Sequence, residues 1–145
     1  MMSVSKTLFI ALSAILIFSS CNNYGKEYKL DKFHSVYYKG DGVDEATAKK
    51  LAEFLKEGSY FQEGKTAAVQ IEKRKDTFDV NFVIDEKKLN ATVETAFNAY
   101  GSFISKTVFN NAPTCVNLTN DQLEIVKKLG YTAPPVEEPA PAPAQ

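Results

Sequence analysis

The chain has 145 residues, and its 17 basic residues nearly balance its 18 acidic ones, for a formal net charge of −1. A chain of this length forms one domain with a modest hydrophobic core. The near balance of charge creates no strong electrostatic field, which argues against nucleic acid as a partner.

The first 20 residues have the pattern of an export signal. Lys6 is their only charged residue, and the eleven residues 8–18 are apolar except for one Ser. Ser19, Ser20 and Cys21 follow, which completes the order of charge, apolar stretch and small residues found in signal peptides. As a helix, eleven residues rise about 17 Å, short of the roughly 30 Å hydrocarbon core of a bilayer. A membrane-spanning anchor is therefore not expected here.

The segment Phe18-Ser19-Ser20-Cys21 resembles the lipobox of bacterial lipoproteins, with Phe18 in place of the more usual Leu. The resemblance covers residues 1–21 only. It implies that the signal is removed before Cys21 and that acyl chains on this residue hold the protein in the membrane of the cell envelope. Asn22, in place of Asp, favours the outer membrane if the organism has one. The alternative is an ordinary signal peptide with an incidental cysteine.

Beyond the signal at residues 1–20, we expect three segments. Residues 21–32 are the lipidated N-terminus and a polar tether, and residues 33–131 form a single α+β domain. Residues 132–145 are a Pro/Ala-rich disordered tail. The run from 133 onward holds five of the six prolines, which have no backbone N–H to donate within a helix or sheet.

Within the domain, strands and helices alternate. A strand is expected at 34–39, followed by a helix that Asp44 opens and Gly58 ends. The strict two-residue alternation of residues 67–72 and 78–84 predicts two strands joined by a hairpin tip at 73–76. A second helix begins near Asn90, a strand covers 114–118, and a short last helix carries Leu123, Val126 and Leu129.

This order of elements, β-α-β-β-α-β-α, predicts a ferredoxin-like sandwich. In that fold one antiparallel sheet is covered on one face by both long helices, and here a short C-terminal helix follows.

The leading functional hypothesis is a lipid-anchored, non-enzymatic binding or accessory module that contacts an envelope protein. No cofactor, no metal and no nucleic acid are expected. The partner is expected to contact the sheet face opposite the helices or the basic hairpin tip. These positions are Gln70, Glu72, Asp79 and Asn81 on the face, and Lys73, Arg74 and Lys75 at the tip.

Two alternatives remain open. One is a small thiol-dependent enzyme in which Cys115 is the nucleophile and His34, the only histidine, is the base. The other is a protease-inhibitor-like module. If Cys21 carries lipid, Cys115 has no disulfide partner within the chain, and a buried, unreactive thiol is expected at this position.

Overall fold

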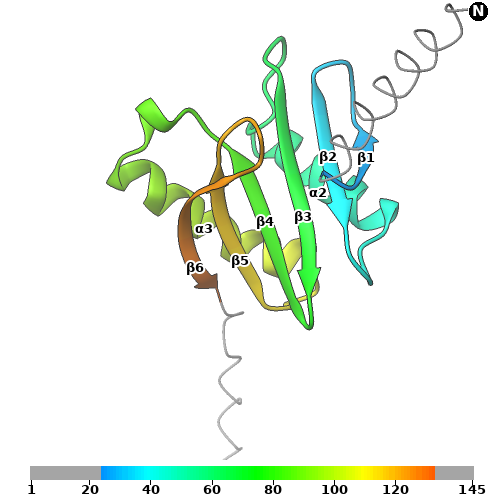
Figure 1. Cartoon of the computed structure of the whole chain (residues 1–145). Coiled ribbons are helices and arrows are strands. Elements are labelled where there is room, and N and C mark those ends of the chain that lie inside the picture. Colours follow the sequence, from blue (N-terminus) through cyan, green and yellow to red (C-terminus); the bar gives the residue numbers. More distant parts are fainter. Residues whose placement is uncertain (1–23, 133–145) are drawn as a thin grey trace, which may run out of the picture.

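The computed structural model describes residues 24–132, which fold around one six-stranded sheet (Figure 1). The strands lie in the order β1-β2-β3-β4-β5-β6, so neighbours in the chain are neighbours in the sheet. The elements in chain order are β1 (Lys26–Lys29), β2 (His34–Lys39), α2 (Glu45–Glu57), β3 (Ala67–Arg74), β4 (Thr77–Val83), the short 3-10 helix η2 (Glu86–Lys88), α3 (Ala91–Thr107), β5 (Thr114–Thr119) and β6 (Ile125–Thr132).

The sheet is mixed. Three antiparallel pairs, β1–β2, β3–β4 and β5–β6, alternate with two parallel pairs, β2–β3 and β4–β5. A helix connects each parallel pair, α2 the first and α3 the second. No helix among residues 24–132 is long and apolar enough to cross a membrane.

Both helices pack on the same side of the sheet, behind the strands in the view of Figure 1. The side chains of Phe54 on α2 and Tyr100 on α3 meet edge to face, with ring centroids 6.1 Å apart. The two parallel pairs run in opposite directions, and both connections move across the sheet in the same sense. The two connections therefore have opposite hands, so one of them departs from the right-handed rule that βαβ units usually obey.

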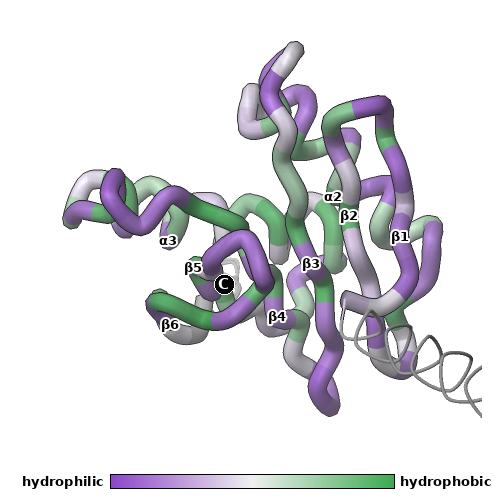
Figure 2. The backbone as a smooth tube through the Cα atoms, turned by 45° about the horizontal axis from the view of Figure 1, so that its top comes forward, coloured by the Kyte–Doolittle hydropathy of each residue, from purple (hydrophilic) through white to green (hydrophobic). Residues whose placement is uncertain are grey.

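The core lies between the helices and one face of the sheet, which we call the apolar face. Along each strand, the side chains of the apolar face alternate with polar side chains that point to the other face. Figure 2 shows hydrophilic residues at the β3–β4 and β5–β6 turns. The apolar sheet residues buried on this face are Val36, Tyr38, Val69, Ile71, Phe78, Val80, Phe82, Val116 and Leu118. Leu51 and Leu55 of α2 and Ile104 of α3 cover them and are fully buried.

Several sequence-based expectations are confirmed. The β3–β4 hairpin pairs Val69 with Phe82 and Ile71 with Val80, as the alternation requires. The side chain of Asp44 accepts from the Thr47 amide at the start of α2, and Asn90 accepts from the Val93 amide at the start of α3. These side chains satisfy N–H groups that the first turn of a helix leaves without partners.

The ferredoxin-like prediction is wrong. In that fold the sheet is antiparallel, and each βαβ connection passes over an intervening strand. Here each connection joins adjacent parallel strands, and the six-stranded sheet is mixed. The order of strand and helix along the chain is the same for both topologies, so local sequence patterns do not distinguish them.

The predicted last helix is also wrong, because the segment forms β6. The Asn120 carboxamide oxygen accepts from the amides of Gln122 and Glu124 at 3.0 Å each, which closes a tight turn after β5. Leu123 has a φ of 60°, a left-handed conformation that no α-helix contains. The three-residue spacing of Leu123, Val126 and Leu129 therefore does not reflect a helix.

The sheet also begins earlier than expected. Part of the segment expected to be a tether forms β1, whose residues Lys26–Lys29 pair antiparallel with β2 as the sheet's edge. The lipobox and the apolar stretch before it, like the Pro-rich segment 133–145, lie outside the described residues.

Candidate functional site

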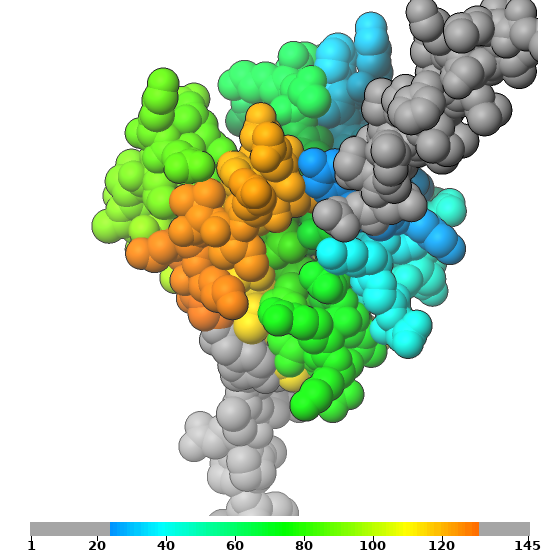
Figure 3. Space-filling view, viewed as in Figure 1, coloured from blue at the N-terminus to red at the C-terminus, as the bar shows by residue number. Residues whose placement is uncertain are grey.

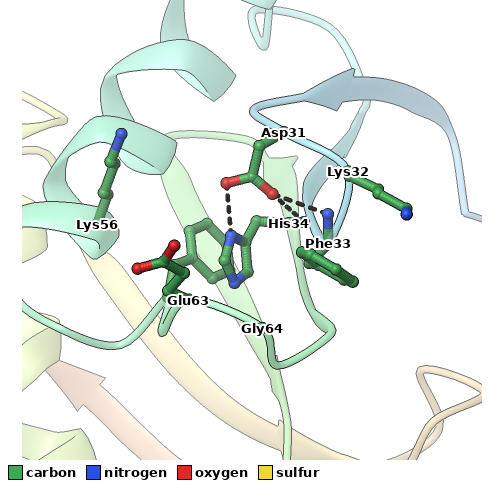
Figure 4. Close-up of a pocket in the computed structure, with 8 residues that line it drawn as sticks. Asp31, Lys32, Phe33, His34, Lys56, Glu63 and Gly64 are labelled. Atoms are coloured by element: carbon green, nitrogen blue, oxygen red, sulfur yellow. Dashed lines mark hydrogen bonds and ion pairs between the residues drawn. The ribbon is translucent and has the colours of Figure 1, made fainter.

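A cavity of about 420 Å³ lies where β2 begins, at the end of α2 (Figure 4). This volume is within the range of small-molecule sites in proteins. It is lined by Asp31, Lys32, Phe33, His34, Lys56, Phe61, Glu63 and Gly64. These residues come from the β1–β2 turn, the start of β2, the last turn of α2 and the loop that follows it. Only His34 among them was a candidate site residue in the sequence.

His34 lies in the wall of this cavity and is 4% exposed. Its Nδ1 is 2.7 Å from Asp31 Oδ2, and its Nε2 is 2.9 Å from the carbonyl oxygen of Gln62. The imidazole stacks on the ring of Phe61, with centroids 4.7 Å apart. His34 thereby joins the β1–β2 turn to the loop after α2.

Both partners of the His34 ring are hydrogen-bond acceptors, one a carboxylate and the other a carbonyl. Both ring nitrogens are therefore engaged by groups of the protein itself. Neither nitrogen is left free to exchange a proton with a substrate. The geometry suits a residue that holds the cavity wall in place, not a general base.

The Asp31 carboxylate collects three donors. Besides the imidazole, its Oδ1 accepts from the amides of Phe33 at 2.8 Å and His34 at 3.0 Å. The hydrogen bond from His34 is the main cause that lowers the pKa of Asp31 below its ordinary value of 3.8, and the Phe33 amide adds to it. Asp31 is therefore ionised at neutral pH and orients the histidine.

The remaining lining residues combine apolar and charged groups. Phe33 is 37% exposed, so an aromatic ring is available at the mouth of the cavity, while Phe61 forms a buried wall. The ammonium of Lys32 lies 5.5 Å from the centroid of the Phe33 ring. Besides the hydrogen-bonded pair of Asp31 and His34, the lining carries the ammonium groups of Lys32 and Lys56 and the carboxylate of Glu63.

The residues expected to form an open docking face are on the side of the sheet opposite the helices, which we call the polar face. Three of them are buried instead of open, because Gln70, Asp79 and Asn81 are 3%, 2% and 5% exposed. Asn81 donates to Gln70 Oε1 and accepts from Asn117, each at 2.9 Å. We call Gln70, Asn81 and Asn117 the amide row, since they occupy facing positions on β3, β4 and β5. Gln70 and Asn81 therefore do not form the open surface that was expected at these positions.

A smaller cavity of about 110 Å³ lies beside the amide row, and Glu72, Arg74, Asp79 and Lys128 contribute to its lining. Arg74 forms an ion pair with Asp79 through Nε and Oδ2. Asp79 Oδ1 is buried without a hydrogen-bond partner in the described part of the chain. This cavity is small and its charges balance, so it is the weaker candidate for a ligand site.

The basic tip expected at Lys73, Arg74 and Lys75 is not a single patch. Lys73 turns toward the apolar side, with its ammonium 5.1 Å from the centroid of the Phe78 ring. Arg74 turns to the polar face and its Asp79 partner, and only Lys75 stands in the turn itself, with a φ of 56°.

The structure does not bring His34 and Cys115 together. His34 points to the apolar face and Cys115 to the polar face, three strands away. At about 4.8 Å per strand and about 3.3 Å per residue along a strand, the two lie roughly 20 Å apart. Burial is the main cause that raises the pKa of the Cys115 thiol, and the charge of Asp79 adds to it. The raised pKa keeps the thiol protonated and slow to react at neutral pH.

Replacing Asn81 by Leu should destabilise the domain by about 2–4 kcal/mol, because Gln70 and Asn117 would each lose a buried hydrogen-bond partner. Urea unfolding monitored by circular dichroism measures this loss. The matched control is Lys49→Gln on the exposed side of α2, expected to change stability by less than about 0.5 kcal/mol. An Asn81→Leu protein as stable as the control would contradict the burial of the amide row.

The lowered pKa of Asp31 predicts a pH-dependent contribution to stability. The contribution of its carboxylate is fully present above the ordinary value of 3.8 and is lost as the pH falls through the lowered value. In urea unfolding, Asp31→Asn should therefore be less stable than wild type at pH 6, and the difference should shrink in stronger acid. The same substitution in a His34→Leu background should have a smaller effect, because the main cause of the shift is absent. A difference that stays constant from pH 6 to pH 2 would contradict this account.

One comparison with known proteins gives a match. A family model described as "AF_1994_N: family N-terminal domain" matches residues 29–130, from the last residue of β1 into β6. No curated protein and no solved structure matches the chain. Because the family model covers well over half of its length, the chain belongs to the AF_1994_N family.

Proposed function

We propose that this chain is a lipoprotein of the cell envelope, anchored through acyl chains on Cys21, whose folded domain binds a ligand without catalysing a reaction. The pattern of residues 8–21 supports the anchor and favours the outer membrane in an organism that has one. The domain itself is a member of the AF_1994_N family.

The observation that carries the binding proposal is the state of His34. This histidine lies in the wall of the largest cavity described above, and both its nitrogens are bonded to acceptors of the protein itself. A catalytic histidine needs a nitrogen that exchanges a proton with the reacting group. A histidine fixed from both sides instead gives the cavity a constant shape, and a preformed cavity lowers the entropic cost of binding.

The lining defines the chemistry of the ligand. The exposed ring of Phe33 and the buried ring of Phe61 suit an apolar or aromatic group. The ammonium groups of Lys32 and Lys56 favour a negative charge next to that group. The ligand class is therefore a small molecule or a peptide C-terminus that joins an apolar group to a carboxylate, and an envelope protein bearing such a group is the expected partner.

The anchor is tested on protein extracted from the native membrane. Intact mass should show a chain that begins at Cys21 and carries acyl chains, and Cys21→Ser should yield a form without them. Cys115→Ser, the matched control at the other cysteine, should remain acylated. A mature N-terminus elsewhere with no acyl mass would overturn the lipoprotein proposal.

The cavity is tested with a pair of probes of similar size and opposite charge, 3-phenylpropionate and phenethylamine. In NMR titrations, 3-phenylpropionate should shift the amide signals of Phe33, Phe61 and Gly64, whereas phenethylamine should bind more weakly. Lys56→Gln should weaken 3-phenylpropionate binding several-fold, because it removes one of the two positive charges. The control Lys49→Gln, on the same helix but outside the cavity, should leave it unchanged. Shifts that map to other surfaces, or equal binding of both probes, would refute this site.

A further inference from the structure

Gly25 turns the chain just before β1, so that Tyr24 lies toward the middle of the sheet. This residue has a φ of +85°, a conformation that side chains other than glycine rarely adopt. A Cβ atom at this position would come within 2.4 Å of the carbonyl oxygen of Tyr38, closer than atoms in proteins approach. Glycine therefore allows the chain to pass close over β2.

Two contacts hold the residue before this turn on the polar face. The ring of Tyr24 lies against that of Tyr37 on β2, with centroids 5.7 Å apart. The carbonyl oxygen of Tyr24 accepts a hydrogen bond of 3.0 Å from Gln70 Nε2 on β3. Gln70 is itself bonded to Asn81, so the amide row fixes the position of Tyr24.

Cys21 precedes Tyr24 by three residues, which span at most about 11 Å when fully extended. We propose that the polar face of the sheet lies against the headgroup region of the bilayer that holds the acyl chains of Cys21. The inference rests on the lipidation proposed above. An anchor this short, leaving from this face, cannot place the opposite side of the domain on the membrane.

The composition of the polar face suits the headgroup region. Tyr24 and Tyr37 place aromatic rings with polar hydroxyl groups there, and such residues are favoured at membrane–water interfaces. Arg74 and Lys128 offer donors to headgroup phosphates. Glu72 and Asp79 balance these charges, so the contact depends on the short anchor and does not require anionic lipid. Figure 3 shows this side of the molecule, where segments of β3, β4 and β6 reach the surface.

Two adjacent lysines of β6 provide the test. Lys128 is exposed on the polar face, whereas Lys127 faces the helix side, where it forms an ion pair of 3.5 Å with Glu94 and its side chain is 49% exposed. The full lipidated protein is added to preformed phosphatidylcholine vesicles and acetylated with an N-hydroxysuccinimide ester. Mass spectrometry then gives the rate at each lysine relative to its rate in urea. The bilayer should slow Lys128 several-fold below Lys127 and below Lys49 on α2.

A matched variant separates the effect of the anchor from that of the fold. About 20 Gly/Ser residues inserted after Asn22 give a linker with a typical span of about 25 Å, which should return Lys128 to a rate at least equal to that of Lys127. Equal rates at Lys127 and Lys128 in the wild-type protein on vesicles would overturn the inference, as would protection of Lys128 that persists with the long linker. Intact mass on the same vesicles identifies a missing acyl group, which would instead mean that the lipoprotein proposal has failed.

Discussion

The two-sided pattern of the β3–β4 hairpin is the constraint on which the rest of the structure depends. Successive side chains of a strand point to opposite faces, so each residue of the hairpin belongs either to the apolar core or to the polar face. Val69, Ile71, Val80 and Phe82 are fully buried beneath the helices. Gln70 and Asn81, between them in sequence, lie on the other face. A shift of one residue in the pairing would exchange these sets and place amides in the core.

The polar face must be satisfied as completely as the apolar one. A buried amide without a partner costs roughly 1–3 kcal/mol, so the burial of Gln70 and Asn81 is tolerated only because each bonds the other and a further group. At one end that group is Asn117, and at the other it is the carbonyl of Tyr24. The row therefore connects β5, across β4 and β3, to the chain that precedes β1. Tyr24 is held by the interior of the sheet, although it falls within the segment expected to be a polar tether.

Local pattern was sufficient to predict most elements but not their arrangement. The hairpin and both long helices follow from alternation, helical spacing and the caps at Asp44 and Asn90. Strand order depends on contacts between distant segments. The same order of elements along the chain fits a sheet in which the two strands joined by a helix are adjacent and a sheet in which another strand lies between them. In the last segment, the spacing of Leu123, Val126 and Leu129 matches a helix by coincidence, because Asn120 and the left-handed Leu123 form a turn instead.

The candidate site was less predictable, because residue type is an incomplete guide to burial. Gln70, Asp79 and Asn81 are polar types that usually face water, and the sequence alone favoured an open surface. The signal that distinguishes a buried row is the choice of uncharged amides at facing positions on three neighbouring strands, and it is visible only once the register is known. For His34, the residue that explains its position is close by in the sequence. Asp31 lies three residues earlier in the turn, a spacing that lets one carboxylate bond both the ring and the backbone.

The two faces of the sheet have different roles in the proposed function. His34 and Phe61 belong to the apolar side, so the larger cavity opens within the helix layer at the end of the sheet. Tyr24 and the amide row belong to the polar side, from which the chain leads to Cys21. If the polar side rests on the bilayer, the cavity stays within the layer farther from the membrane, where a soluble ligand or a partner protein can reach it. A long tether would leave this orientation free, whereas three residues and a hydrogen-bonded Tyr24 restrict it. By fixing Tyr24, the amide row thus determines the orientation of the domain on the membrane, and this orientation determines which surface a ligand can reach.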